Sequence, residues 1–451
     1  MDKVDYFRKH GLFDAKVPRY TSYPPANHFQ QGTGSRNQAS WLRAVPAESE
    51  ISVYIHIPFC KRLCWFCACR TQGTKTLRPV DAYVEFLKKE ISAVRAELPE
   101  NLRMSRLHLG GGTPTILSAQ TMQNLLESVF DAFDLAADFE FSVEMDPTEV
   151  TDELMETVVR FGMNRASVGV QDFDPKVQEA IGRLQSLKET HHVVNFLRDQ
   201  GVRSLNLDLL YGLPHQTVAT FARTLEHVFD MQPDRLAIYG YAHVPWMSKR
   251  QVLIKSEDLP APEARLALAE MTHEKFTENG YLPIGIDHFA LPSDSLSSAV
   301  ERGRLRRNFQ GYTDDQSETL IGLGASAISR FQQGYVQNAT ATSAYQERIA
   351  AGGLSGHKGY HMSDQDQLIA LAVEDLMCRF TFREKALCAA FPEFAGTIHS
   401  IAIRLMGRFP DIFFISDSGL EMREEARPLV RIIASFVDEF TSTGKAHAAA
   451  I

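Results

Sequence analysis

The sequence predicts an α/β protein, in which a parallel sheet with covering helices is followed by a smaller, mainly helical domain. Between about residues 51 and 290, short runs rich in β-branched residues alternate with amphipathic helical patterns. Several of these helical patterns end in Gly, which is typical of helix C-termini. From about residue 361 onward the pattern is helical, apart from one predicted hairpin over 413–422.

The candidate strands of the sheet are seven runs, at 51–59, 106–110, 139–147, 165–171, 204–212, 235–244 and 281–289. Helical patterns lie between them, for example at 81–98, 153–162 and 263–280. Strands joined through helices run parallel, because an antiparallel pair needs only a short turn. The periodicity alone permits a doubly wound sheet or a barrel, open or closed.

Three divisions of the chain are expected. Residues 1–50 show no clear period and are predicted to form an N-terminal arm, in which 18–29 is an extended stretch. Residues 51–345 are predicted to form the β/α domain with an extension, and residues 346–451 the helical domain.

Composition excludes several classes of protein as first guesses. The 451 residues include 47 Lys and Arg against 56 Asp and Glu, a formal net charge of −9. Binders of duplex nucleic acid or anionic membranes normally carry a basic surplus. No window approaches the roughly 18 apolar residues of a spanning helix, and the charged N-terminus lacks the apolar core of a signal peptide. We expect a cytoplasmic monomer without nucleic-acid or membrane partners.

Four of the six cysteines lie within ten residues, at Cys60, Cys64, Cys67 and Cys69. Disulfide frameworks spread their cysteines along small secreted domains, so this cluster indicates metal or redox chemistry instead. Cys60-x3-Cys64-x2-Cys67 directly follows the first strand, and its three thiolates could hold three irons of a [4Fe–4S] cluster. The fourth iron would stay open to a small molecule.

Zinc is the alternative occupant of the cysteine cluster, with Cys69 as a fourth ligand. The single residue between Cys67 and Cys69 makes it awkward for both to bind one ion. Cys378 and Cys388 lie in the predicted helical domain and are interpreted as ordinary buried thiols.

Polar residues interrupt the ends of other candidate strands. The Gly-rich turn at 110–114 allows the backbone to approach a ligand closely. Glu144 ends an apolar run, and a buried carboxylate needs a partner, so a ligand contact is favoured over a structural ion pair. Gln171 and Asp208 occupy comparable strand positions, as expected at a barrel mouth. Arg183 follows a short helix in a loop, where a solvated surface residue is the commoner interpretation.

The C-x3-C-x2-C run with Phe66 before its last cysteine resembles the radical S-adenosylmethionine superfamily. The resemblance implies a partial or full β/α barrel, with the site at the carboxyl ends of the strands. It also implies that the open iron chelates S-adenosylmethionine and that reduction releases a 5′-deoxyadenosyl radical. The 110–114 turn resembles a motif that holds the methionyl amino group; Thr113 stands where that motif usually has Glu, so this contact is expected from backbone.

A second set of motifs resembles one branch of this superfamily, which oxidatively decarboxylates coproporphyrinogen III without oxygen. These motifs lie at 18–24, 54–60, 67–69, 110–115, 169–173, 208–214, 241–245, 287–290, 307–313 and 324–329. The resemblance therefore implies conversion of two propionates to vinyl groups with loss of two CO2, in porphyrin biosynthesis. A propionate has no electron sink, so no acid or base could expel its CO2 directly, whereas a carbon radical can.

The same resemblance assigns roles to individual residues. Cys60, Cys64 and Cys67 would ligate the [4Fe–4S] cluster, and Cys69 would serve catalysis without binding iron. Two S-adenosylmethionine molecules per chain are implied. The first would be bound by Tyr54, Gly111, Glu144 and Ile328. The second would be bound by Phe66, Gly112, Thr113, Gln171, Arg183, Asp208 and Ala242. The electron would come from a low-potential donor such as a flavodoxin or ferredoxin.

A substrate with four carboxylates needs positive charge, and the local charge reverses the overall sign. Residues 51–80 carry five Lys and Arg and no acid, and 302–307 carries four arginines. Solvated surface is the alternative interpretation of such runs. Arg62 and Arg307 are candidates for binding substrate carboxylates. Arg19 is a third, if the 18–24 segment folds over the barrel mouth as a lid.

Three other functions compete with this hypothesis. A related haem chaperone shares the three-cysteine motif, but Cys69 and the 18–24 segment favour the decarboxylase. A radical haem-modifying methyltransferase is less clearly excluded by these features. A purely structural zinc module is disfavoured by the barrel pattern.

Overall fold

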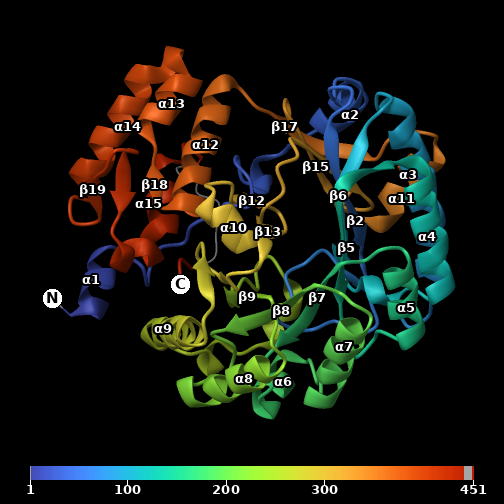
Figure 1. Cartoon of the computed structure of the whole chain (residues 1–451), viewed down its shortest axis with the longest axis horizontal. Coiled ribbons are helices and arrows are strands. Elements are labelled where there is room, and N and C mark those ends of the chain that lie inside the picture. The colour runs from blue at the N-terminus through green and yellow to red at the C-terminus, as the bar shows by residue number, and fades with distance from the viewer. Residues whose placement is uncertain (1, 441–448) are drawn as a thin grey trace.

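The computed structural model describes residues 2–440 and 449–451, in which a curved sheet with its helices lies beside a C-terminal helical group (Figure 1). Residues 441–448 of the predicted helical domain lie outside the described part of the chain. No helix within the described residues is long and apolar enough to cross a membrane.

The central sheet has 13 strands, and seven consecutive ones run parallel in the order β14-β2-β5-β6-β7-β8-β9. Their bounds are β14 (Thr319–Leu323), β2 (Glu50–Ile57), β5 (Arg103–Gly111), β6 (Asp134–Met145), β7 (Arg165–Gln171), β8 (Ser204–Tyr211) and β9 (Arg235–Gly240). The two outermost strands of this parallel run, β14 and β9, do not pair with each other. Each pairs instead with an antiparallel strand, β14 with β15 and β9 with β11. The barrel is therefore open, which confirms the predicted partial β/α barrel.

Antiparallel strands extend both ends of the parallel run. Beyond β14 follow β15 (Ile328–Phe331), β16 (Gly334–Asn338), β17 (Gly356–His361) and β1 (Gln30–Gln31). Beyond β9 follow β11 (His288–Ala290) and β10 (Leu282–Ile284). Short pairs outside the sheet are β3 (Phe59–Cys60) with β4 (Gln72–Gly73), and β12 (Arg306–Asn308) with β13 (Gly311–Thr313).

Helices connect the parallel strands and cover the outer face of the sheet (Figure 1). They are α3 (Arg78–Glu97), α4 (Ala119–Ala132), α5 (Asp152–Arg160), α6 (Pro175–Ile181), α7 (Leu187–Asp199), α8 (Val218–Asp230) and α9 (Pro262–Glu278). Ser or Thr side chains cap several N-termini, as Ser118 and Thr151 do for α4 and α5. The buried residues of α3 recur at helical spacing, so one face packs on the sheet in the main core.

Four helices near the C-terminus form the second structural unit, the C-terminal helical body. They are α12 (Asp364–Arg379), α13 (Glu384–Ala390), α14 (Ala395–Arg408) and α15 (Val430–Val437), with the small sheet β18 (Thr381–Phe382), β19 (Phe413–Ile415) and β20 (Leu420–Met422). The antiparallel pairing of β19 with β20 confirms the hairpin predicted at 413–422. Two further helices, α10 (Ser295–Glu301) and α11 (Thr342–Ala350), lie in the extension.

The N-terminal 50 residues are more regular than predicted. They contain α1 (Lys3–Lys9), a 3₁₀ turn at Ala26–His28 and α2 (Thr33–Arg43). Phe7 and Leu12 pack in the core of the C-terminal helices, whereas Trp41 packs in the main core. A few large apolar residues stabilise these helices, whose periodicity in the sequence is weak. The predicted extended stretch at 18–29 contains no α-helix. The boundaries predicted at 50 and 345 stay predictions.

The seventh predicted strand, 281–289, is also wrong. This run forms the antiparallel hairpin β10–β11, in which Gly285 reverses the chain at a φ of +59°. A Cβ at this position would lie about 2.0 Å from the ring of Tyr312, so only Gly fits. The seventh parallel strand is instead β14, which pairs with β2 although about 260 residues separate them.

Candidate active site

The inner face of the barrel is polar. Alternate residues of a strand point to the same face, and at most of the inward positions of β5, β6, β7 and β8 the residue is charged or hydrogen-bonding. A cavity of about 830 Å³ fills this interior and extends to the loop that carries the clustered cysteines. The strand residues that line it include Ser52, Arg106, His108, Glu140, Ser142, Glu144, Arg165, Ser167, Asn206, Asp208, Arg235 and Tyr239.

Three cysteines of the predicted ligand set line this cavity together. Cys60 ends β3 just after β2, and Cys64 and Cys67 follow in the next loop; all three are free thiols, and Cys60 and Cys64 are buried. In the described chain, no three His, Cys, Asp or Glu side chains converge on a point where one metal ion would sit. Cluster thiolates bind different irons and need not converge in this way, so the donor set fits an iron–sulfur cluster.

Two neighbouring segments hold the cysteine loop in place. The backbone N–H of Trp65 donates to the carbonyl of Ile181, and the indole packs where a Cβ on Gly182 would collide with it. On the other side, Ser248 donates to the carbonyl of Cys67 and Gln251 to that of Phe66. The loop is therefore positioned by backbone contacts.

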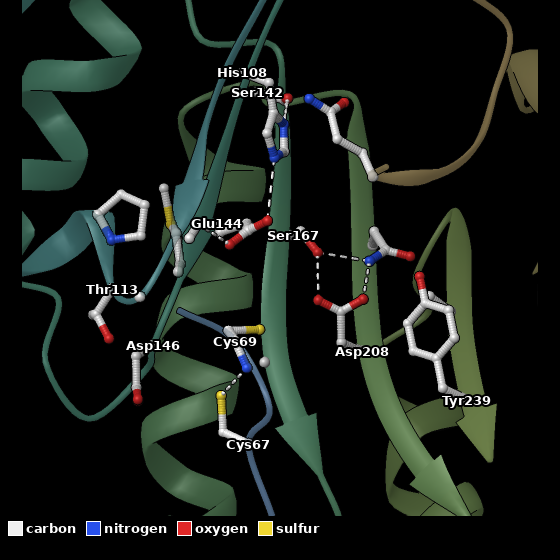
Figure 2. Close-up of a pocket in the computed structure, with 18 of the residues that line it drawn as sticks. Cys67, Cys69, His108, Thr113, Ser142, Glu144, Asp146, Ser167, Asp208 and Tyr239 are labelled. Carbon is white, nitrogen blue, oxygen red and sulfur yellow. Dashed lines mark hydrogen bonds and ion pairs between the residues drawn. The ribbon is translucent and has the colours of Figure 1, made fainter. Parts of the chain in front are cut away.

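Cys69 contacts Cys67 and lines the same cavity. Its backbone N–H donates to the Sγ of Cys67 over 3.4 Å, as the dashed line in Figure 2 shows. Hydrogen bonding from Cys69 lowers the pKa of Cys67 to about 6, although burial opposes the shift. Burial raises the pKa of Cys60 to about 11. Cys69 itself is exposed to the cavity.

Glu144 is the acceptor of a short network on one wall (Figure 2). The N–H of Gly111 donates to Oε2 over 2.9 Å, and His108 Nε2 lies 3.2 Å from Oε1. Burial would raise the pKa of Glu144, but the hydrogen bond and charge of His108, with the N–H of Gly111, lower it. The Glu144 side chain is still 39% exposed, so the ion pair leaves it open to the cavity.

Asp208 lies on β8, two strands along the same wall from Glu144, and accepts two hydrogen bonds. Ser167 Oγ donates to Oδ2 over 2.7 Å, and Asn206 Nδ2 donates to Oδ1 over 2.8 Å (Figure 2). Burial raises the pKa of Asp208 above its ordinary value. Asn206 Oδ1 is buried without a hydrogen-bond partner in the described residues, which is an acceptor left for a ligand.

Arg183 is buried, so the interpretation as a solvated surface residue is wrong. Gly182 adopts a φ of +66° as the C-cap of α6 and turns the chain inward. The Arg183 Nη1 then lies 3.0 Å from Asp146 Oδ2 and 3.8 Å from Cys64 Sγ. The guanidinium of Arg183 therefore places a positive charge beside Cys64.

The structure brings most of the predicted cofactor residues to this cavity. Phe66, Gly111, Gly112, Thr113, Gln171 and Ala242 all line it. At Gly112 a Cβ would lie about 2.6 Å from the carbonyl of Phe59, so the close approach of these loops requires Gly. Tyr54 and Ile328 do not line the cavity; Tyr54 stacks on His108 instead, with ring centroids 5.7 Å apart.

The three predicted substrate arginines are dispersed. Arg62 lies at the cavity edge and donates to the carbonyl of Leu184 and to Thr148. Arg19 donates to the carbonyl of Gly240 and lines the central cavity and a second one. Arg307 lines only the second cavity, where it pairs with Asp287.

Sequence reasoning missed His108, Ser142, Ser167 and Asn206. Their signal was present, because charged or polar residues alternate with apolar ones along 106–109, 140–145 and 204–209. In a parallel sheet covered by helices, such alternation indicates a polar interior.

Residues 54–228 match the radical SAM superfamily. The chain is 48% identical over 451 residues to an oxygen-independent coproporphyrinogen III oxidase of Paracoccus denitrificans, covering 100% of both chains. It is 36% identical over 430 residues to the protein of that name from Escherichia coli, covering 94% of this chain and 93% of the relative. A solved structure of coproporphyrinogen III oxidase (HemN) from Escherichia coli superposes with a TM-score of 0.89 at 32% identity, covering 94% of this chain and 100% of that one.

Proposed function

Since the chain belongs to the oxygen-independent coproporphyrinogen III oxidases of the radical SAM superfamily, we propose that it converts coproporphyrinogen III to protoporphyrinogen IX. Two propionates become vinyl groups and two CO2 are released, as a step of haem biosynthesis in the cytoplasm. The observation that carries this proposal is 48% identity to a named oxidase over the whole length of both chains. It favours the oxidase over the haem chaperone and the methyltransferase.

Cys60, Cys64 and Cys67 would hold the [4Fe–4S] cluster. When bound, the cluster and S-adenosylmethionine supply a carbon radical that can attack an unactivated propionate. The chain supports this chemistry by its own contacts, since Arg183 places a positive charge beside Cys64 and the loop is fixed at its backbone. Cys69 faces the cavity one residue past a ligand and would serve catalysis.

We propose two S-adenosylmethionine molecules per chain. Gly111 and Glu144 are supported as contacts of the first, because the carboxylate faces the cavity beside the cysteine loop. Tyr54 would act through His108, on which its ring stacks, and Ile328 is proposed from the sequence motif alone. The residues proposed for the second molecule are Phe66, Gly112, Thr113, Gln171, Arg183, Asp208 and Ala242, all of which line the cavity.

Electrons would enter from a low-potential donor such as a flavodoxin or ferredoxin, near the cysteine loop. Trp246 and Met247 are exposed there, at 54% and 68%. The adjacent Ser248 and Arg250 bind the backbone of Cys67 and Cys69. An acidic donor could dock on this apolar and basic surface, with the chain acting as a monomer.

An anaerobic assay tests the function. The reconstituted protein, with S-adenosylmethionine, a reductant and coproporphyrinogen III, should release two CO2 per substrate and form protoporphyrinogen IX. Cys64→Ser should lose the visible absorption of the cluster and all turnover, whereas the control Cys388→Ser should keep both. Cys69→Ser should keep its iron and lose turnover. Stoichiometric haem binding without product formation would instead support the chaperone.

Equilibrium binding of S-adenosylmethionine tests the second molecule. Wild-type protein should bind two equivalents, and Asp208→Asn and Arg183→Ala about one. Losing one partner of a desolvated charged contact weakens affinity at least about 30-fold. Iron content is measured in parallel, because Arg183 also touches Cys64. Two equivalents of unchanged affinity in Asp208→Asn would contradict the proposal.

A further inference from the structure

A second cavity, of about 370 Å³, adjoins the central one. Its lining comes from the N-terminal segment, β9, α9, the β10–β11 hairpin and the C-terminal helical body. Arg19 and residues 239–242 line both cavities, so the two cavities are adjacent and share this wall. Ala242, proposed above to touch S-adenosylmethionine, belongs to this shared wall.

Five arginines line this second cavity, which we call the arginine cavity. The side chain of Arg427 is 42% exposed and pairs with Glu424. The other four are Arg19, Arg265, Arg307 and Arg431. Asp287 is the carboxylate paired with one of them, at 3.3 Å from Arg307 Nη2. Of the other acidic lining residues, Glu270 is half-buried, with a buried Oε1, and the rest are exposed. Glu270 pairs with Lys3 and Glu424 with Arg427, while Glu274 and Glu425 are exposed. The interior therefore has an excess of positive charge.

Two of these arginines have N–H groups without an acceptor. Arg307 has a side chain only 3% exposed, and its Nη1 is buried without a hydrogen-bond partner among the residues described. The Nε of Arg265 is also buried without a hydrogen-bond partner among the residues described, although the Nη2 of the same side chain donates to the carbonyl of Tyr241 over 2.8 Å. A buried donor without an acceptor is unfavourable, and an entering anion would satisfy it.

Arg431 has a different part in the arginine cavity. Its guanidinium donates to the carbonyls of Val17, Pro18, Ala449 and Ala450, so its hydrogen bonds are satisfied within the protein. Its charge is not. Burial, followed by repulsion from Arg19 and Arg307, lowers the pKa of Arg431 to about 9. An anion in the cavity would relieve this repulsion.

We propose that the arginine cavity binds a carboxylate of the tetrapyrrole, from the two propionates that the reaction leaves intact, with Arg265 and Arg307 as its direct ligands. This inference rests on the function proposed above. Guanidinium groups bind carboxylates through paired hydrogen bonds, and both arginines have an N–H available for this.

The stoichiometry of the reaction explains why such an anchor is useful. Of four propionates, two lose CO2 at the radical site and two survive both turnovers. A cation site for the surviving groups can orient the ring without interfering with the reacting ones. Arg19, on the wall between the cavities, would place its charge between the anchored and the reacting ends.

Fluorescence titration with porphyrins tests the proposal. Coproporphyrin III has all four propionates, and protoporphyrin IX only the two that survive. Arg265→Gln and Arg307→Gln should each weaken both porphyrins by a similar factor, at least about 30-fold. Arg223→Gln, a change on the exposed surface of α8, is the control and should have no effect. The tetramethyl ester of coproporphyrin III should bind wild-type protein weakly.

Three outcomes would overturn the proposal. These are unchanged affinity in both variants, a loss confined to coproporphyrin III, or ester binding as tight as that of the free acid. Arg265→Gln should keep its affinity for S-adenosylmethionine and an unfolding midpoint near wild type, and Arg265→Lys provides a variant that keeps the charge. Arg307→Gln should lower the midpoint, because it leaves Asp287 buried without its cation, so its porphyrin affinity is measured on the folded protein. Wild-type protein without porphyrin binding or product would refute the proposed function, whereas active wild type with unaffected variants would refute only this inference.

Discussion

Buried arginines gather in two places in this protein, and their surroundings differ. At the amino-terminal end of the barrel strands, Arg106, Arg165 and Arg235 face three carboxylates. Arg235 binds Asp294 through two hydrogen bonds of 2.6 and 3.0 Å, and Arg165 lies 3.0 Å from Glu140. Arg106 lies 3.7 Å from Asp314. In the arginine cavity, Arg307 pairs with Asp287, whereas Arg19, Arg265 and Arg431 donate to backbone carbonyls.

The difference separates charges that serve the fold from charges that serve a ligand. A buried cation is tolerated only when its charge and hydrogen bonds are compensated. At the barrel end each guanidinium lies beside a carboxylate that compensates its charge, although the Nε atoms of Arg106 and Arg165 lack a hydrogen-bond partner among the described residues. The arginine cavity holds more guanidinium groups than buried carboxylates, which supports the proposal that an anion from outside completes it.

The largest expected effect on stability is at the barrel end, where the arginines are paired with carboxylates. Arg235→Gln leaves Asp294 without its cation, and the two side chains are only 5% and 3% exposed. Breaking a buried pair in this way costs about 3–5 kcal/mol of unfolding free energy. Urea unfolding measures the loss, and porphyrin affinity of the folded fraction should change little. A loss below about 1 kcal/mol would mean that the barrel end is not held by its ion pairs.

A smaller effect is expected for Asp287→Asn, which removes the internal partner of Arg307. The variant loses hydrogen bonds to charged groups, which should lower the free energy of unfolding by about 2 kcal/mol. Porphyrin affinity should rise in the titration, because the carboxylate competing for Arg307 is gone. Reduced affinity would show instead that Asp287 positions Arg307 for the ligand.

The same variant gives a pH test. Burial alone would raise the pKa of Asp287, but the charges of Arg307 and His288 hold this pKa well below its ordinary value. Its contribution to stability is therefore present above the unfolded-state pKa of about 4 and is lost as the pH falls below it. The difference in unfolding free energy between wild type and Asp287→Asn should shrink between about pH 5 and pH 3.

The smallest expected effect on stability is for Arg265→Gln. Its guanidinium makes one hydrogen bond to Tyr241 and leaves Nε unpaired, so the cost should stay under about 1 kcal/mol. Calorimetric unfolding measures it without ligand. With saturating coproporphyrin III, wild type should gain a rise in midpoint that the variant lacks. An equal rise in both would remove Arg265 from the binding site.

Much of the barrel could be predicted from sequence, since six of its parallel strands alternate with helices in one continuous stretch. β14 could not, because five residues after an irregular region carry little periodic signal and pair with a strand far away. The hairpin at 281–289 looked like one strand because Gly285 is a single residue in an apolar alternation.

The site was likewise predictable where its residues are close in sequence, and not where distant segments form it. The cysteines are close in sequence, so their spacing alone suggested a cluster. Arg265 and Arg431 lie on α9 and α15, and only the packing of the helical body against the barrel places them in one cavity. The burial of Arg183 depends on one left-handed turn at Gly182, which local composition does not reveal.

The pairing of β2 with β14 has a consequence for biosynthesis. β2 is an interior strand of the finished sheet, with Ile51, Val53 and Ile55 almost fully buried, but its partner on one side emerges about 260 residues later. At a translation rate of roughly 5–20 residues per second, that delay is about 13–50 s. Throughout this time one edge of an apolar strand is available to other nascent chains, so chaperone protection matters most before residue 323 leaves the ribosome.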